Sequence, residues 1–313
     1  MDWLRNLLMP PRGSTFADQV DPLFWFLVGL TAFFFLLIAG LSGWFILRYR
    51  RGRAVRRSVA PTHNTALELV WSLIPLALVI VIFFWGFHGY ISAAVPPADA
   101  LEIKVLAKRW LWQFEYPNGL RTVNDLRVPV GKPVKLVMIS EDVIHSFYVP
   151  SFRIKQDVLP SRYTQVWFEA TEPGVHRLLC TEYCGRGHSD MLGTIQVVSA
   201  EEYQQWLDSG GGLGEGMPPA QLGRLIYTQY GCEVCHSLDG TRKEGPSFRG
   251  IFGKPVLLTG GQTVIADENY IRESILNPQA KIVAGYQPVM PTFQGLLNER
   301  QINALIEFIK EQK

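Results

Sequence analysis

The chain has 313 residues, a formal net charge of +2 at pH 7, and a composition that is 48% hydrophobic and 19% charged. The near balance of charge argues against any large nucleic-acid-binding surface, and the length allows about two soluble domains of ordinary size. Phe, Leu, Trp and Ile are concentrated in about the first 90 residues, whereas the rest resembles an ordinary soluble protein in composition. We therefore expect a membrane part followed by an aqueous part.

Two apolar runs near the start of the chain are each long enough to cross about 30 Å of hydrocarbon as a helix. They predict transmembrane helices over about 23–47 and 67–90, within an N-terminal region of residues 1–95. Between them lies the arginine-rich stretch RYRRGRAVRR, while the flanking segments carry few basic residues. Since positive charge favours the cytoplasmic side, we expect this loop in the cytoplasm and both chain ends outside it.

Two other interpretations of this region are weaker. An arginine cluster can bind nucleic acid, but a short loop between two spans is where charge that sets membrane orientation belongs. The first apolar run could be a cleaved secretory signal, but such signals have a shorter apolar region and a small-residue cleavage site. With both spans retained, everything from about Val95 onward lies outside the cytoplasm.

Residues 101–198 change to short β-type runs. The runs are EIKVLAK, KPVKLVMIS, TQVWFEA, GVHRLLC and GTIQVV, and clusters of Pro and Gly separate them. In the third run Val166 and Phe168 occupy alternate positions, so one face of that strand is expected to be buried. The pattern predicts a small all-β sandwich or barrel, which we assign to residues 96–200.

One loop between two of these runs carries the side chains of a soft metal site. It reads Cys180-Thr-Glu182-Tyr-Cys184-Gly-Arg-Gly-His188-Ser-Asp-Met191. Thiolate, imidazole and thioether together suit copper, and two cysteines four residues apart can each bridge a pair of copper ions. A second imidazole has to come from elsewhere. His145 in EDVIHSFYVP is the best candidate, although a lone histidine in a β-domain is more often structural.

Cys180 and Cys184 have two other possible uses, a disulfide in an oxidising compartment or a zinc site of the form C-x3-C-x3-H. A disulfide leaves the spacing of His188 and Met191 without a purpose, and structural zinc does not use a thioether. Copper uses all of these side chains, so copper is the favoured interpretation.

A second domain follows a linker. We assign residues 201–217 to a short helix and a linker, because the run AEEYQQWL (200–207) is helical in pattern and the stretch SGGGLGEGMPP (209–219) is typical of a flexible linker. We assign residues 218–313 to a helical domain, whose first helix is expected from Pro219 to about Tyr230. Its last helix has apolar residues at helical spacing and a capping pair. The apolar residues are Ile302, Leu305, Ile306 and Ile309, and the capping pair is Asn298 and Gln301.

The sequence Cys232-Glu-Val-Cys235-His236 is the attachment motif of c-type haem. A CxxCH sequence can also be a thiol redox motif, but the helical segments around it favour haem. The two motifs use all four cysteines of the chain. A haem iron needs a further ligand, and Met290 in the Pro-bounded stretch GYQPVMPTF is the candidate, since Met217 lies in the linker.

We expect tethering, rather than charge, to bring this domain to the copper domain. Residues 218–313 hold ten Lys plus Arg against nine Asp plus Glu, so no strong electrostatic docking face is visible. About eleven linker residues give a root-mean-square reach of roughly 18 Å, which implies an effective concentration of about one millimolar.

Four stretches of the chain resemble subunit II of haem-copper cytochrome c oxidases, which carries a binuclear copper (CuA) centre. They are NTALELVWSLIP, KRWLWQFEYP, EDVIHSFYVPSFRIKQDVLPSR and CTEYCGRGHSDMLG, in the same order. The resemblance implies a cupredoxin-like fold. The CuA ligands it implies are the bridging thiolates Cys180 and Cys184, the imidazoles His145 and His188, the axial thioether Met191, and Glu182 through its backbone carbonyl. It also implies that the Glu182 side chain reaches a magnesium ion at the junction with the catalytic subunit.

Residues 218–313 resemble class I cytochromes c, in which the histidine of CxxCH and a methionine of a Met-Pro loop ligate the iron. The resemblance implies His236 and Met290 as axial ligands, Cys232 and Cys235 as the haem attachments, and Pro246 beside His236 at the haem edge. A His/Met pair raises the haem potential, so this domain is expected to take electrons from moderately high-potential donors and pass them to copper.

The resemblance to oxidase subunit II implies roles for two more residues. Trp110 in KRWLW corresponds to an exposed aromatic through which that family accepts electrons, although its period-two spacing with Trp112 also fits a buried strand. Glu68 of Glu68-Leu-Val-Trp71 corresponds to a residue that helps protons into a channel of the catalytic subunit, or it snorkels to the membrane interface. Three histidines match no ligand position and are expected at surfaces or interfaces, namely His63, His88 and His176.

These features predict a multi-domain membrane protein with a two-helix transmembrane hairpin, an all-β cupredoxin-like domain and an all-α class I cytochrome c domain, as in subunit II of a caa-type oxidase. The chain lacks the many-helix, histidine-rich core of an oxygen-reducing centre, so oxygen reduction and proton translocation are expected in a catalytic subunit I. Further expected partners are other oxidase subunits, membrane lipid, and cytochrome c or another respiratory complex as donor, without nucleic acid.

The expected location is the bacterial inner (cell) membrane, as a multi-pass protein with the copper and haem domains on the periplasmic or extracellular side. Two rival functions remain open at this point. One is a free-standing, membrane-tethered electron carrier, and the other is the electron-accepting subunit of a nitric oxide reductase. The copper ligands do not separate them, because all three would carry the same centre.

Overall fold

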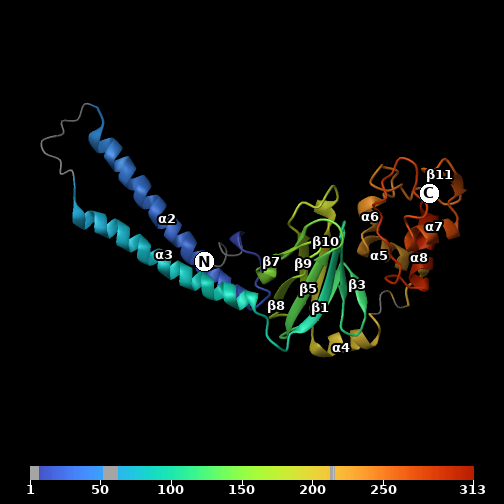
Figure 1. The fold of residues 1–313 in the computed structure, drawn as a ribbon, viewed down its shortest axis with the longest axis horizontal. Helices are drawn as coiled ribbons and strands as arrows, with labels where there is room; N and C mark the ends of the chain where they lie inside the picture. Colours follow the sequence, from blue (N-terminus) through green and yellow to red (C-terminus); the bar gives the residue numbers. More distant parts are fainter. Residues whose placement is uncertain (1–6, 52–62, 212–213, 215) are drawn as a thin grey trace. The chain divides into compact units, whose positions relative to one another are not determined.

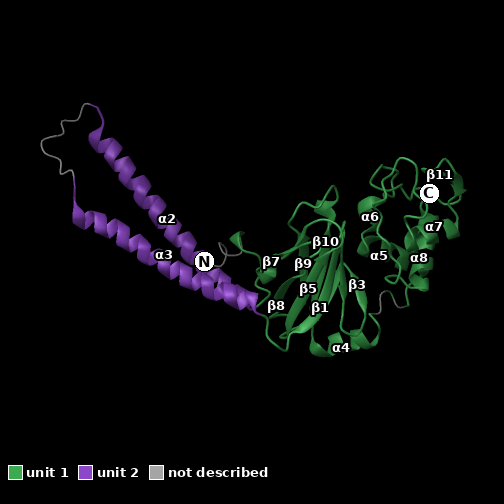
Figure 2. Cartoon of the chain, in the orientation of Figure 1, with its two compact units in different colours: residues 1–14, 96–313 green, residues 15–95 purple. Residues whose placement is uncertain are grey.

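The structure is a computed structural model that describes residues 7–51, 63–211, 214 and 216–313. The chain divides into two compact units, Thr15–Val95 and a larger unit that joins Met1–Ser14 to Pro96–Lys313 (Figure 2). Most of the arginine-rich loop and part of the Gly-rich linker lie outside the described residues.

The smaller unit is a hairpin of two long helices, α2 (Phe16–Tyr49) and α3 (Thr65–Ala94) (Figure 1). They contact each other through a hydrogen bond from Gln19 Nε2 to Ser92 Oγ of 3.2 Å and through the rings of Phe26 and Trp85, whose centroids are 5.6 Å apart. Apolar side chains are exposed along both helices, which fits a lipid environment. At 34 and 30 residues, the helices extend beyond the predicted spans at both ends.

The larger unit contains a sandwich of two five-stranded sheets, with strand orders β3-β2-β1-β5-β8 and β4-β10-β9-β6-β7 (Figure 1). The strands are β1 (Leu101–Lys108), β2 (Leu111–Glu115), β3 (Arg121–Val123), β4 (Asp125–Pro129), β5 (Pro133–Ser140), β6 (His145–Val149), β7 (Ile154–Val158), β8 (Thr164–Glu169), β9 (Gly174–Cys180) and β10 (Leu192–Val198). Each of the five predicted runs forms a strand. β1 pairs with β5 and β4 with β10 in parallel, and this mixed pairing completes a cupredoxin-like sandwich.

Alternating side chains fill the space between the two sheets. In β5, every second side chain is fully buried, from Val134 through Leu136 to Met138. In β8, Phe168 is buried as predicted, but Val166 is buried only in part, because β8 lies at the edge of its sheet. After the last strand, α4 (Ala200–Asp208) packs Trp206 against the sandwich.

The C-terminal part of the larger unit is mainly helical. Its elements are α5 (Pro219–Gln229), α6 (Cys232–Cys235), β11 (Pro255–Leu257), β12 (Thr263–Ile265), α7 (Glu268–Leu276) and α8 (Glu299–Glu311). The two short strands are an addition to the expected all-α domain. α8 begins at the predicted capping box of Asn298 and Gln301, and it packs its apolar face on α5.

The crossing of α5 and α8 depends on Gly223. A Cβ atom at this position would lie 2.1 Å from the backbone oxygen of Ala304 and 2.6 Å from Cβ of Phe308. Because the nearest atom belongs to the backbone, Gly223→Ala has to push the helices apart, and we expect it to cost about 1–3 kcal/mol of stability. Denaturant unfolding followed by circular dichroism measures this loss.

Gly260→Ala is the matched control, since a Cβ atom there would have no other atom within 4 Å. It should change the free energy of unfolding by less than about 0.5 kcal/mol. Equal stability losses for the two variants would contradict the close helix crossing.

Candidate metal centre and apolar cavity

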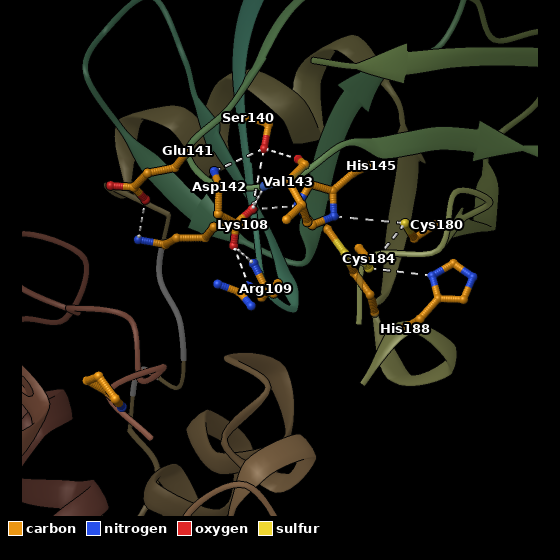
Figure 3. A network of polar contacts seen from close by, with 12 residues as sticks. Lys108, Arg109, Ser140, Glu141, Asp142, Val143, His145, Cys180, Cys184 and His188 are labelled. Carbon is orange, nitrogen blue, oxygen red and sulfur yellow. Dashed lines mark hydrogen bonds and ion pairs between the residues drawn. The ribbon is translucent and has the colours of Figure 1, made fainter. Parts of the chain in front are cut away.

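Sulfur and nitrogen atoms converge at one end of the sandwich (Figure 3). Cys180 Sγ, Cys184 Sγ and a ring nitrogen of His145 all lie within 4.8 Å of one another. Cys184 Sγ lies 3.8 Å from Cys180 Sγ, 3.5 Å from His188 Nδ1 and 3.8 Å from Met191 Sδ. The two cysteines are free thiols, since a disulfide would need a sulfur separation of about 2 Å.

Strand ends hold these side chains in place. His145 is the first residue of β6, and Cys180 is the last residue of β9, which pairs with β6. The loop from Cys180 to Met191 then leads through the short 3-10 helix η2 (His188–Asp190) into β10. His145 and Met191 are fully buried, so most of the donor set is shielded from water and fixed by the sheet.

The backbone of Glu182 also faces the cluster. Its carbonyl oxygen lies 3.3 Å from Cys180 Sγ, where it can act as one more oxygen donor. The Glu182 side chain, in contrast, belongs to an exposed residue, and no described contact draws it into the cluster. The carbonyl and the carboxylate of this residue are therefore available for different partners.

Asp142 is a part of the site that the sequence analysis missed. Its Oδ1 lies 2.9 Å from His145 Nε2, and its Oδ2 accepts hydrogen bonds from Arg109 N at 2.9 Å and Arg109 Nε at 3.0 Å (Figure 3). Nδ1 of His145 is left to face Cys180. The available signal was the spacing Asp142-x-x-His145, which puts a carboxylate within reach of the imidazole.

The charges of this pair support each other. Burial alone would raise the pKa of Asp142, but hydrogen bonds from His145 and Arg109 outweigh it and hold that pKa well below its usual range. Burial likewise opposes the charged form of His145, and the Asp142 carboxylate reverses this and raises the pKa of the imidazole. Within the thiol pair, the hydrogen bond from Cys184 lowers the pKa of Cys180, which therefore ionises first.

A cavity of about 1320 Å³, including its open mouth, lies beside the CxxCH motif. Cys232, Cys235, His236 and Met290 all line it, so the structure brings the four residues named from the sequence to one space. The other walls are mainly apolar. They include Phe248, Ile271, Ile275, Phe293, Leu305 and Ile309. Walls of this kind and size suit a large, flat, apolar group.

His236 is positioned as an iron ligand would be. Its Nδ1 donates to the carbonyl oxygen of Pro246 at 2.7 Å, its ring stacks on Phe248 with centroids 4.5 Å apart, and its backbone carbonyl accepts from Tyr227. Burial lowers the pKa of His236 and so favours the neutral imidazole. With Nδ1 occupied, Nε2 remains free to bind a metal. A Cβ atom on Gly245 would lie 2.5 Å from the ring, so only glycine fits there.

Trp110 lies between the two sites. It is 7% exposed, and it lines the cavity. A Cβ atom on either Gly185 or Gly187 of the loop from Cys180 to Met191, here called the copper loop, would approach its ring within 3.2 Å. The sequence left open whether Trp110 is a core residue or an electron acceptor. The structure places it in a buried position that touches both sites.

The other residues discussed in the sequence lie away from the metal centre and the cavity. Glu68 is in the first turn of α3, with Oε1 3.0 Å from His63 Nδ1, and His88 is exposed on the same helix. His176 is half-buried against Phe152, and its Nδ1 lies 2.9 Å from Ser151 Oγ. None of these histidines takes part in the metal cluster of the described residues.

A soft-ligand cluster on a cupredoxin-like sandwich, a CxxCH cavity and two long apolar helices define a membrane-anchored electron-transfer protein of the copper and c-type haem class. Two protein-family models match separate parts of the chain. The family model for the periplasmic domain of cytochrome c oxidase subunit II matches residues 118–198, and the model for cytochrome c matches residues 220–313.

Relatives cover most of the chain. Cytochrome c oxidase subunit 2 of Alkalihalophilus pseudofirmus is 30% identical over 295 residues, which are 90% of this chain and 81% of the relative. That of Cereibacter sphaeroides is 28% identical over 244 residues, 64% of this chain and 79% of the relative. The solved periplasmic domain of subunit II from Bradyrhizobium japonicum is 30% identical, covers 37% of this chain and 96% of its own, and has a TM-score of 0.35. The chain belongs to the cytochrome c oxidase subunit 2 family.

Proposed function

We propose that the chain is the electron-accepting subunit of a haem-copper terminal oxidase, in which electrons pass from a donor to haem c, then to CuA, and then to a catalytic subunit that reduces oxygen to water. The observation that carries this proposal is the arrangement of two sites in one compact unit, a cysteine-histidine-methionine cluster and a CxxCH cavity, with Trp110 touching both. When they are bound, CuA and haem c each supply one-electron transfer.

The donor set of the cluster fits a pair of copper ions. The two thiols 3.8 Å apart, with imidazole, thioether and carbonyl donors beside them, would hold such a pair. The proposed ligands are His145, Cys180, Cys184, His188, Met191 and the backbone carbonyl of Glu182. Because strand ends hold His145 and Cys180, and the loop between β9 and β10 holds the others, these donors need to move little between oxidation states, which favours fast electron transfer.

The cavity fits haem c. Cys232 and Cys235 would attach the porphyrin, while His236 and Met290 would bind its iron. His236 is the better defined of the two, since the Pro246 carbonyl fixes the tautomer that leaves Nε2 free. A His/Met pair raises the haem potential, which suits a donor of moderately high potential such as a cytochrome c or another respiratory complex.

Trp110 would carry electrons from the haem cavity toward the copper loop. Its burial argues against direct contact with a soluble donor, and its place in the wall of the CxxCH cavity argues for a fused one. Trp110 can therefore be both a buried residue and an electron acceptor, because the chain's own cytochrome domain covers its ring.

Other proposed features concern the membrane complex. Glu68, in the first turn of α3 and beside His63, would help protons into a channel of the catalytic subunit. The exposed Glu182 side chain would reach a magnesium ion shared with that subunit. The apolar hairpin would cross a bacterial inner membrane among lipid and other oxidase subunits, with both cofactor domains on its periplasmic or extracellular side.

The Asp142 carboxylate should strengthen copper binding, because it fixes the tautomer and orientation of His145 and raises its basicity. We expect Asp142→Asn to weaken copper binding by about 10–100-fold, as measured by competition with a chelator. Asp99→Asn removes an exposed carboxylate of the same unit and should leave copper binding unchanged. Equal affinities for the Asp142→Asn and wild-type proteins would show that the carboxylate does not act through His145.

The proposed function is tested by purifying the complex that co-isolates with a tagged chain from detergent-solubilised membranes. With a reduced donor, we expect rapid oxygen uptake that cyanide abolishes. A co-purified reaction centre that reduces nitric oxide instead would move the assignment to a nitric oxide reductase. A chain that carries both cofactors but retains no catalytic partner under mild detergents would indicate a free electron carrier.

A further inference from the structure

The copper loop contacts the haem attachment motif directly, and not only through Trp110. Gly187 is buried, and a Cβ atom there would lie 2.8 Å from Cγ1 of Val234 as well as 2.6 Å from the Trp110 ring. Val234 stands between the two cysteines of the motif, and Gly187 precedes His188. Only a glycine lets the loop and the motif approach this closely.

An ion pair lies next to this contact. Arg186 Nη1 is 2.9 Å from Glu244 Oε1. The Arg186 side chain is 84% exposed, whereas that of Glu244 is 20% exposed. Glu244 precedes Gly245, which packs on His236. The pair therefore joins the middle of the loop that carries Cys184 and His188 to the residue before Gly245, which packs on the His236 ring.

Further contacts extend the same surface. Asn124 Nδ2 donates to the carbonyl oxygen of Gln229, at the end of α5, over 3.0 Å. Leu111 and Val123 of the sandwich belong to the apolar cluster that includes Leu222 and Tyr230 of the cytochrome domain. The surface thus has an apolar centre and polar contacts, as specific docking surfaces do.

We propose that residues 185–187 of the copper loop are a docking surface for the CxxCH motif and Glu244 of the same chain. The Arg186–Glu244 pair then fixes the orientation in which the cytochrome domain docks. The inference rests on the proposed function and adds a defined docked state to it. The flexible tether expected from the sequence then serves to keep the partners close, while these contacts select one orientation. The docked domain also covers Trp110, so a soluble donor has to deliver its electrons to the haem.

A largely exposed ion pair adds little free energy, but reversing one charge places two like charges against each other at a partly buried position. Like-charge contacts in an interface oppose association and register. Arg186→Glu should therefore shift the domains out of the docked state, and the exchange Arg186→Glu/Glu244→Arg should restore it. Arg186→Lys keeps the charge and should behave as wild type.

The experiment uses the purified complex with haem and copper contents verified for each variant. Haem c is photoreduced, and the rate of electron transfer to copper is measured together with hydrogen–deuterium exchange of the Cys184–Met191 loop. We expect Arg186→Glu to slow transfer at least about tenfold and to increase exchange in the loop, with Arg186→Lys and the double exchange within about twofold of wild type.

Arg272→Glu is the control, since it breaks an ion pair with Glu299 that lies within the cytochrome domain. It should leave both quantities unchanged. If wild type transfers electrons rapidly and Arg186→Glu does so at the same rate, the docking proposal is wrong while the relay stands. If wild type shows no transfer from haem to copper, the proposed function itself fails.

Discussion

Cys184→Ser is expected to remove the copper pair and leave the haem in place. Cys184 Sγ is the central atom of the cluster, in contact with Cys180, His188 and Met191 at 3.5–3.8 Å. Serine supplies a hard and protonated oxygen in place of a soft thiolate. We expect copper to fall from two ions to fewer than about one per chain, as determined by metal analysis, and oxygen uptake by the complex to fall with it.

Ser189→Ala changes an exposed residue of the same loop and serves as the control for Cys184→Ser. It should retain both copper ions and full oxygen uptake. Normal copper content in Cys184→Ser would mean that the thiol does not bridge the metals.

The double variant Cys232→Ala/Cys235→Ala is expected to lack covalent haem and to retain copper. The two thiols are the attachment points beside the cavity, whereas the copper donors come from β6 and from the loop between β9 and β10 of the sandwich. Haem staining of the denatured chain should be lost. Because the donor can no longer reach copper through haem, donor-driven oxygen uptake should fall by at least about 100-fold.

Glu233→Gln, an exposed change within the same motif, should attach haem normally. The assignment of the motif would be contradicted if the double variant still carried haem after denaturation.

Local spacing explains why much of the site could be predicted from the sequence. The ligands Cys180, Cys184, His188 and Met191 lie within one loop, and the CxxCH motif is contiguous, so the order of residues alone indicated their chemistry. His145 lies 35 positions before Cys180, so the sequence made it only the best candidate for the second imidazole, and the resemblance to a family identified it as a ligand.

Contacts between distant segments could not be predicted in the same way. Asp142 acts through a hydrogen bond to His145, and its role depends on the turn before β6. Arg186 and Glu244 are far apart in a chain whose cytochrome domain is nearly neutral, so net charge gave no sign of one specific pair. The fold elements were easier to predict, since they depend on local apolar periodicity.

The most direct test of the central claim is to photoreduce haem c in the purified oxidase and to follow the haem and copper absorbances in the same sample. We expect the haem to be reoxidised at the rate at which copper is reduced, and donor-driven copper reduction to be lost in Cys232→Ala/Cys235→Ala. Copper reduction by the same donor at the wild-type rate in that haem-free variant would contradict the central claim, because the donor would then reach copper without the haem.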